Sequence, residues 1–333
     1  MRLKSLCLQT LSIIYGLVTS LKNFLYDAGF ADQIQLSTPV LSVGNLSVGG
    51  TGKTPVVEWI LRSAIEKNLK VAVIARNYKA QSFGPCKVDP MRLQGALFYG
   101  DEAFSIAQKF PEVSVWTGPQ KYRTAQQAVL TQKFDLLVID DGFQHRSLRR
   151  DFDLVLIDTT AVPEENHLLP QGLLREGFSS LERADAVLLS KVHLSSLEKI
   201  ESVRQKIPKS LPLAEVSFHS EFFNSISADS RSLAVSGIAK PLQFIESLKL
   251  QTVFPVEHLV FSDHHIYSEE DAQNIFQKMK SLECQQVLTT EKDFVKLQNF
   301  LDLVPYLNPV QIKAQFHTEI KGLNEFLDKC IHL

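Results

Sequence analysis

The segment Gly44–Pro55 reads GNLSVGGTGKTP and carries the residue types that hold the phosphates of a nucleotide. Glycines let the backbone wrap around phosphate oxygens with its N–H groups turned inward. A lysine placed after them reaches the β- and γ-phosphates, and the hydroxyl of a following threonine is a ligand for Mg²⁺. The segment therefore predicts a site for a nucleoside triphosphate and Mg²⁺, formed by Gly49, Gly50, Thr51, Gly52, Lys53 and Thr54.

The surroundings of this segment are those of a phosphate-binding loop. The apolar run PVLSV precedes it, and a helical pattern with Pro55 in its first turn follows it, so a bound anion would face the positive end of a helix. The usual pattern has a glycine where this chain has Ser47. The alternative is a glycine-rich turn between strand and helix in which the Lys-Thr pair occurs by chance.

Two acids close a second apolar run, FDLLVIDD, at Phe134–Asp141. In an open α/β sheet, Asp140 and Asp141 would lie at the carboxyl edge, where ligands bind. We predict that Asp140 belongs to the Mg²⁺ site and that Asp141 lies close behind it. The alternative is an acid that caps the next segment. The polar run that follows contains Gln144, His145, Arg146, Arg149 and Arg150. Arg149 or Arg150 would neutralise a phosphate, and the alternative for the arginines is a solvated face.

A third acidic group, in Gly100–Glu102, precedes another helical pattern. A carboxylate there is placed to accept the proton of an attacking hydroxyl group. Asp101 fits equally well as a helix N-cap, whose side chain accepts a hydrogen bond from the helix backbone. Spacing alone favours the N-cap.

The elements that must position these groups are short strands that alternate with helices. The predicted strands are Val40–Val43, Lys70–Ala75, Phe134–Ile139, Leu154–Ile157, Ala186–Leu189, Leu233–Val235 and Gln286–Thr289, and the predicted helices include Pro55–Lys67, Glu102–Lys109, Lys121–Thr131, Pro241–Leu248 and Ser268–Leu282. This alternation predicts an α/β fold of the P-loop NTPase type, with a mainly parallel sheet and helices on both of its faces.

A Ser-rich stretch without clear periodicity, Ser217–Ser230, predicts a domain boundary. We therefore expect an N-terminal apolar helix at 1–30, a P-loop kinase domain at 31–225 and a second, smaller α/β domain at 226–333.

The net charge of −2 gives no basic field that would attract nucleic acid, so no nucleic-acid partner is expected. The four cysteines are far apart in sequence, which excludes a zinc knuckle and a Cys-x-x-Cys redox pair.

The first helix carries no charge from Ser5 to Leu21, between Lys4 and Lys22. These seventeen residues would span roughly 25 Å as a helix, just short of a bilayer core. Three interpretations follow: a helix packed on the domain, an anchor that lies in the membrane interface or spans it shallowly, or a cleaved signal peptide. The last is disfavoured because no small-x-small cleavage site follows.

Seven motifs occur in an order that resembles one known family. They read VGNLSVGGTGKTP, YGDEAF, VIDDGFQHRSLRRDFDLVLID, LLPQGLLRE, VSGIAKPLQF, FSDHHIYS and VLTTEKDFVKL, and they run from about Val43 to Leu297. Together they resemble the tetraacyldisaccharide 4'-kinase (lipid A 4'-kinase) family of Gram-negative bacteria. The DDGFQHR, DHH and TTEKD blocks are the specific ones.

The resemblance implies an activity, a cofactor and a location. The γ-phosphoryl group of ATP would be transferred, with Mg²⁺, to the 4'-hydroxyl of a tetraacyl glucosamine disaccharide 1-phosphate, which forms a lipid A precursor (lipid IVA). The acylated lipid is the implied partner, and the enzyme would work at the cytoplasmic face of the inner membrane, held there by its N-terminal helix. No obligate protein partner is implied.

The resemblance also implies a role for each matching residue. Asp101 would be the catalytic base, paired with a histidine of the DHH motif, of which we favour His264 over His265. Lys53 and Thr54 would act on the phosphates and Mg²⁺, with Asp140 and Glu102 near the metal. The other implied active-site and substrate-binding groups are Asp141, Gln144, His145, Arg175 and Tyr78, the last in an Arg-x-Tyr turn. We expect the smaller domain to close over the site and exclude water.

Two other function classes compete with this interpretation. A GTP-hydrolysing switch or metallochaperone usually carries Asn-Lys-x-Asp, whereas the nearest segment here is Ser190-Lys191-Val192-His193, which lacks both the Asn and the Asp. A non-catalytic nucleotide-binding membrane tether needs fewer acids than the four at Asp101, Glu102, Asp140 and Asp141.

Overall fold

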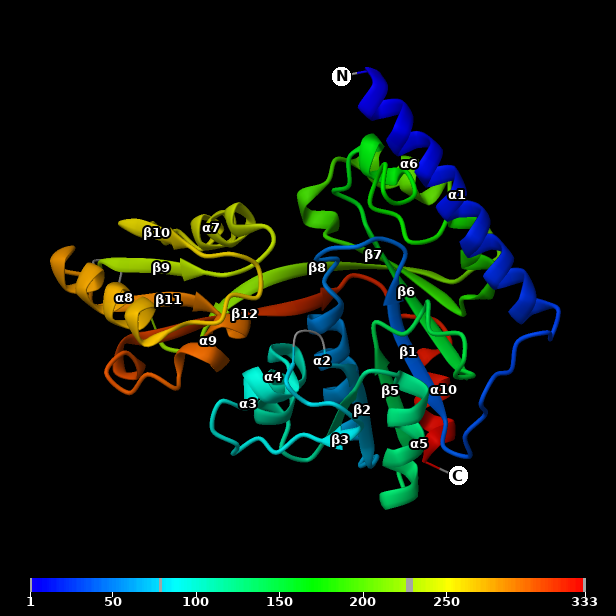
Figure 1. Ribbon diagram of the computed structural model, residues 1–333, viewed down its shortest axis with the longest axis horizontal. Coiled ribbons are helices and arrows are strands. Elements are labelled where there is room, and N and C mark those ends of the chain that lie inside the picture. The colour runs from blue at the N-terminus through cyan, green and yellow to red at the C-terminus, as the bar shows by residue number, and fades with distance from the viewer. Residues whose placement is uncertain (1, 78–79, 226–229, 332–333) are drawn as a thin grey trace. The chain divides into compact units, whose positions relative to one another are not determined.

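The computed structural model describes residues 2–77, 80–225 and 230–331 (Figure 1). The chain forms two compact units, each built from separate segments. The first comprises Met1–Ile74, Gln120–Phe218 and Ala314–Leu333, and the second comprises Ala75–Pro119 and His219–Lys313.

The first unit is built on a parallel sheet. Its strands lie in the order β8 (Leu213–Phe222), β7 (Ala186–Ser190), β6 (Phe152–Asp158), β1 (Val40–Asn45), β5 (Leu136–Asp140) and β2 (Val71–Arg76), and neighbouring strands pair in parallel. Both faces of these strands are buried, which explains why β1, β5 and β7 are buried at every position. The order changes direction at β1, and the loops after β1 and β5 therefore meet at the carboxyl edge.

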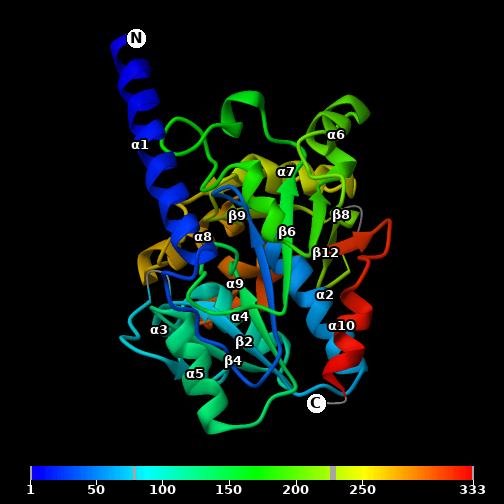
Figure 2. The ribbon, with the colours of Figure 1, turned by 90° about the vertical axis from the view of Figure 1, so that its right-hand side faces the viewer.

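Helices cover both faces of this sheet. They are α1 (Arg2–Asp27), α2 (Lys53–Glu66), α5 (Lys121–Thr131), α6 (Leu197–Arg204) and α10 (Leu323–Cys330), with short 3-10 helices η1 (Pro163–Asn166), η2 (Phe178–Arg183) and η3 (Val192–Leu194). Helices α2 and α10 lie side by side, joined by the Lys67–Asp328 ion pair of 2.5 Å, and α5 lies on the other side of the strands (Figure 2).

The second unit also contains parallel strands, in the order β10 (Glu257–Val260), β9 (Ser232–Ser236), β11 (Gln286–Thr290) and β12 (Leu307–Phe316). A short antiparallel pair, β3 (Cys86–Lys87) with β4 (Ser114–Gly118), belongs to the same unit. Its helices are α3 (Gly95–Tyr99), α4 (Asp101–Lys109), α7 (Pro241–Leu250), α8 (Glu269–Ser281), α9 (Glu291–Leu297) and η4 (Val304–Tyr306).

Alternate residues of the central strand β9 face opposite sides of the sheet. Leu233 and Val235 belong to one apolar cluster together with Ile275 of α8, whereas Ala234 belongs to another together with Phe244 of α7. The period of two in a strand produces this division. The second unit is therefore also a helix–sheet–helix arrangement, which agrees with the α/β fold predicted from the sequence.

The units differ from the continuous segments 1–30, 31–225 and 226–333 that the sequence predicted. The segment 75–119 leaves the first sheet after β2 and belongs to the second unit, and the C-terminal segment returns to the first. The passage at residues 218–219 falls within the predicted boundary, but it lies inside strand β8 and not in a linker. Buried serines at Ser217 and Ser220 hide the apolar pattern of that strand.

Helix α1 carries the uncharged segment noted in the sequence. Its large apolar side chains are mostly solvent-exposed: Leu11, Ile13, Ile14, Leu17, Val18, Leu21, Phe24 and Leu25. One side of the helix docks on the first unit, where the Ser12 hydroxyl donates to the carbonyl of Leu168 at 2.8 Å. Within the part of the chain described by the structure, no helix is both long enough and apolar enough to cross a membrane.

Candidate active site

The glycine-rich loop connects β1 to α2 in the conformation that its sequence predicts. Gly49 and Gly52 have φ values of 104° and 90°, in the region that favours glycine, and Gly52 is the N-cap of α2. A Cβ atom on Gly52 would lie 2.2 Å from Cζ of Phe218, so the ring also excludes a side chain there. The buried Asn45 side chain donates to the Thr51 hydroxyl at 3.0 Å and fixes the middle of the loop to the end of β1.

The two acids of β5 lie beside this loop. Asp140 pairs in register with Val43 of β1, so both strands end at the same edge. Asp141 adopts a φ of 52° and accepts a hydrogen bond from Arg175 at 2.9 Å, and the Lys53 ammonium lies 3.4 Å from its carboxylate. Burial raises the pKa of Asp141, but the charges of Lys53, Lys121 and Arg175 outweigh burial and hold that pKa well below its usual range. Asp141 is therefore ionised at neutral pH.

A buried lysine that sequence analysis missed supports both acids from behind. Lys121, at the start of α5, is 2% exposed. Its ammonium donates to the carbonyls of Asp140 and Asp141, with a distance of 2.6 Å to the latter. Burial lowers the pKa of Lys121 to about 8, although both neighbouring carboxylates oppose this shift. Lys121 thus fixes the left-handed turn that directs Asp141 towards Lys53.

Replacing Lys121 with Met keeps the volume of the side chain but leaves two buried carbonyls without their donor. We expect the variant to lose about 2 kcal/mol of unfolding free energy and more than about tenfold in phosphoryl transfer, because the Asp141 turn loses its support. Urea denaturation and a steady-state assay measure the two effects. Lys133→Met, an exposed lysine just beyond the same helix, is the control. Wild-type stability and activity in Lys121→Met would contradict this support role.

The LLRE segment reaches the loop through backbone pairing. The Arg175 N–H donates to the carbonyl of Leu46 at 2.6 Å, and the Val48 N–H donates to the carbonyl of Leu173 at 2.8 Å. The Arg175 guanidinium donates to the Gln144 side chain at 3.3 Å as well as to Asp141, and Gln144 donates to the carbonyl of Asn45 at 2.9 Å. Gln144, Arg175, Asp141 and Lys53 are therefore in one network, while His145 lies half-buried on the same loop as Gln144.

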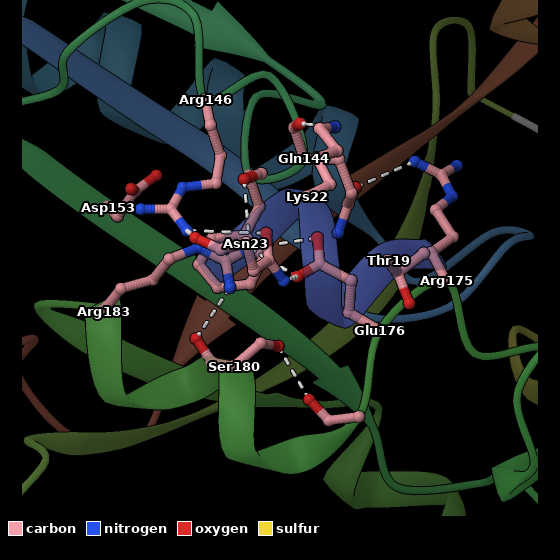
Figure 3. Close-up of polar contacts among 12 residues, drawn as sticks. Thr19, Lys22, Asn23, Gln144, Arg146, Asp153, Arg175, Glu176, Ser180 and Arg183 are labelled. Carbon is pink, nitrogen blue, oxygen red and sulfur yellow. Dashed lines mark hydrogen bonds and ion pairs between the residues drawn. The ribbon is translucent and has the colours of Figure 1, made fainter. Parts of the chain in front are cut away.

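Helix α1 is bonded to this network by its polar side (Figure 3). Lys22 donates to the carbonyl of Gln144 at 3.0 Å, and Asn23 donates to the carboxylate of Glu176 at 2.7 Å. Glu176 also pairs with Arg183 at 2.9 Å, and its side chain is 6% exposed. The N-terminal helix thus contacts Gln144, which accepts a hydrogen bond from Arg175, and Glu176, which follows Arg175 in sequence.

The acid of the Gly100–Glu102 motif lies in the second unit. Asp101 is the first residue of α4, whose N-cap is Gly100. The Asp101 carboxylate lies 2.9 Å from Nδ1 of His264, and both side chains are largely buried. Burial raises the pKa of Asp101, but the hydrogen bond from His264 and the charges of His264, Lys292 and Lys296 lower it to about 2. The same hydrogen bond raises the pKa of His264.

The structure separates the two histidines of the DHH motif. His264 contacts Asp101, whereas His265 lies 3.1 Å from Asp271 of α8. Glu102 forms an ion pair with Lys292 of α9. The sequence-predicted residues therefore fall into two groups: Lys53, Asp140, Asp141, Gln144 and Arg175 in the first unit, and Asp101, Glu102 and His264 in the second. Tyr78 lies outside the described residues.

The donor set at the loop fits Mg²⁺. A threonine hydroxyl at the start of α2 and the carboxylate of Asp140 are hard oxygen donors at one edge of the sheet. Among the residues described, no group of three or more His, Cys, Asp or Glu side chains forms a protein-only metal cage. Mg²⁺ is usually bound by one or two protein oxygens together with substrate phosphates, so this sparse set suits it.

Comparisons with known proteins agree with this arrangement. The family model of tetraacyldisaccharide-1-P 4'-kinase matches residues 4–332. A tetraacyldisaccharide 4'-kinase of Bdellovibrio bacteriovorus is 37% identical over 305 residues, which cover 89% of this chain and 90% of the relative. The kinase of Flavobacterium johnsoniae is 34% identical over 92% of this chain and 91% of its own length.

A solved structure is similar along the full chain. It is the "apo" form of LpxK from Aquifex aeolicus in complex with ATP, which is 27% identical and has a TM-score of 0.76, with 98% of this chain and 99% of that chain covered. The match of the family model, the relatives and this structure leads to one conclusion. The chain belongs to the tetraacyldisaccharide-1-P 4'-kinase family.

Proposed function

We propose that this protein transfers the γ-phosphoryl group of ATP to the 4'-hydroxyl of a tetraacyl glucosamine disaccharide 1-phosphate. The Asp101–His264 pair carries the proposal, because a nucleotide-binding tether has no use for a buried carboxylate bonded to an imidazole. The family to which the chain belongs supplies the acceptor, and the ATP-bound relative from Aquifex aeolicus supplies the nucleotide.

The first unit would hold the nucleotide. The phosphates of ATP would lie against the backbone N–H groups of Gly49–Thr54, with Lys53 neutralising their charge. Thr54 and Asp140 would hold Mg²⁺, which supplies charge neutralisation at the β- and γ-phosphates when bound. Asp141 keeps the Lys53 ammonium beside the loop, and Arg175 and Lys121 in turn hold Asp141.

The second unit would activate the acceptor. Asp101 is ionised at neutral pH, so it can accept a hydrogen bond from the 4'-hydroxyl and then its proton. His264 orients the carboxylate, and its raised pKa lets it share that proton. We propose that both units take part in each turnover and that the second closes over the bound substrates, which would exclude water from ATP.

Transfer of radiolabelled phosphate from ATP to the tetraacyl disaccharide 1-phosphate in detergent micelles tests the function directly. We expect labelled lipid, a requirement for Mg²⁺, and ATP hydrolysis without lipid at less than about a hundredth of the transfer rate, because water lacks the binding energy that closes the site. Competition by GTP is expected to be weak. ATP hydrolysis that is equal with and without lipid, and no labelled lipid, would overturn the proposal.

We also propose that the enzyme works at the cytoplasmic face of the inner membrane with α1 lying in the bilayer interface. Leu17, Val18 and Leu21 are 66%, 62% and 59% exposed, and they share the helix with the polar contacts of Lys22 and Asn23. An apolar face on a helix that is docked by its polar side is suited to the acyl region of a membrane. Such an interface would present the sugar head of the lipid to the first unit.

The substitution Leu17→Glu tests this location. We expect binding to phospholipid vesicles to fall roughly tenfold or more, since an apolar side chain worth about 2 kcal/mol in the bilayer is replaced by a charge. Activity on substrate in detergent micelles should change little. Gln9→Glu adds the same charge to an exposed polar position of the same helix and should leave vesicle binding nearly unchanged. Equal vesicle binding by wild type and Leu17→Glu would refute the interfacial role of α1.

A further inference from the structure

The TTEKD motif contains an acid that is completely buried in the second unit. Asp293 of α9 is 0% exposed. Its carboxylate accepts hydrogen bonds from the Gly237 N–H at 2.9 Å and from the Thr290 hydroxyl at 2.7 Å. The ammonium of Lys296, one turn later on the same helix, lies 3.0 Å from the other carboxylate oxygen. A buried charge requires such compensation, since an uncompensated one costs several kcal/mol of stability.

The residue that donates to Asp293 also holds the histidine of the active pair. The Gly237 carbonyl accepts a hydrogen bond from the His264 N–H at 3.1 Å. His264 has a φ of 57°, a conformation that few non-glycine residues adopt. A Cβ atom on Gly237 would lie 3.0 Å from Asp293 and 3.2 Å from the carbonyl of Ser262, so a larger residue would require these groups to shift by a few tenths of an ångström.

Lys296 joins the buried acid to the other member of the pair. Its ammonium lies 3.9 Å from the Asp101 carboxylate as well as 3.0 Å from Asp293, and its side chain is only 12% exposed. The contacts therefore form a closed ring, called the circuit below, in which each residue contacts the next: Asp293, Gly237, His264, Asp101 and Lys296. Every group of this circuit belongs to the second unit.

We propose that Lys296 and Asp293 are positioning residues for the Asp101–His264 pair. Asp293 fixes the loop that carries His264, and Lys296 holds the Asp101 carboxylate in the orientation that meets Nδ1 of His264. The inference rests on the proposed function, since it assigns these residues to the base of that reaction. Lys292, also in α9, forms an ion pair with Glu102 of α4, and its charge, like that of Lys296, lowers the pKa of Asp101.

The geometry distinguishes this role from a purely structural one. Lys296 acts on the reaction only through Asp101, so its removal should lower kcat and leave the KM for ATP nearly unchanged, because the nucleotide loop lies in the other unit. Once Asp101 has lost its charge, Lys296 has no carboxylate of the pair left to orient. The effects of the two substitutions on kcat should then be strongly non-additive.

The experiment measures kcat and both KM values for Lys296→Met, Asp101→Asn and the double variant, together with their thermal unfolding. We expect Lys296→Met to lower kcat at least about tenfold with KM for ATP within about twofold. In the Asp101→Asn background, the same substitution should change kcat by less than about threefold. Lys278→Met, which removes an exposed ion pair with Glu257 in the same unit, is the matched control and should match wild type.

Asp293→Asn keeps the shape of the buried side chain and tests the other half of the circuit. We expect a loss of kcat that does not add to that of Lys296→Met. Additive losses in the Asp101→Asn and Lys296→Met pair, or wild-type kcat in Lys296→Met, would overturn the inference while leaving lipid phosphorylation by wild type intact. Absence of lipid phosphorylation in wild type would instead contradict the proposed function.

Discussion

Replacement of Asp101 with Asn is expected to lower kcat for lipid phosphorylation by a factor of about 10² to 10⁴, with the KM for ATP within about twofold of wild type. Asn has nearly the same shape as Asp and retains an oxygen that can accept a hydrogen bond from Nδ1 of His264, which lies 2.9 Å away in the wild type. It cannot accept the proton of the attacking hydroxyl. The loss of kcat in this variant therefore measures the role of Asp101 as a base, without a change in the packing of helix α4.

The size of this effect follows from the environment of Asp101. Its pKa of about 2 makes it a weak base, so it does not remove the proton of a sugar hydroxyl before the reaction begins. Phosphoryl transfer passes through a loose transition state in which the hydroxyl loses its proton late. A weak, correctly placed carboxylate is sufficient for this, and its proton can then be shared with His264, whose pKa is raised by the same hydrogen bond.

The measurement combines steady-state kinetics with nucleotide binding. Asp302→Asn, at an exposed position of the same unit, controls for loss of a negative charge. His264→Gln in the Asp101→Asn background should cause little further loss of kcat, because the pair acts as one unit. A kcat for Asp101→Asn near that of wild type would show that another group accepts the proton.

The sequence predicts the parts of the fold in which local pattern and tertiary packing agree. Helix α5 occupies the predicted residues Lys121–Thr131, and strand β7 extends the prediction by one residue to Ser190. Helix α2 begins at Lys53, two residues before the predicted start at Pro55, because the cap is the left-handed Gly52. The sequence prediction did not include strand β12, because a proline disfavours a strand. In the structure, Pro309 lies within β12 and pairs in register with Thr289 of β11.

The candidate site shows the same division. The glycine-rich loop and the acids at the end of β5 lie in contiguous motifs, so local spacing identifies them. Local spacing does not identify Lys121, because a lysine at the start of a helix is normally solvent-exposed. Only the packing of α5 against the end of β5 buries it. The i, i+3 spacing of Asp293 and Lys296 was visible in sequence, but their link to His264 passes through the backbone of Gly237, which no side-chain pattern reveals.

Replacement of Lys53 with Met should reduce phosphoryl transfer by a factor of about 10² to 10³, through loss of the cation that neutralises charge developing on the phosphates. The Lys53 side chain is 15% exposed and has Asp141 as its partner at 3.4 Å. Because Arg175 still donates to the Asp141 carboxylate and the charge of Lys121 still stabilises its ionised form, the carboxylate stays compensated and the loop is expected to remain folded.

Because the Asp141 carboxylate stays compensated, the loss of rate in Lys53→Met can be distinguished from a loss of folding. Thermal unfolding of Lys53→Met should lie close to that of wild type, whereas kcat falls and ATP binds more weakly. Lys67→Met, at the other end of α2, removes an ion pair with Asp328, whose side chain is 56% exposed, and it should leave both rate and affinity unchanged. If Lys53→Met transfers phosphate at the wild-type rate, another cation must neutralise the γ-phosphate. Arg175, which shares Asp141 with Lys53, would then be the first to replace.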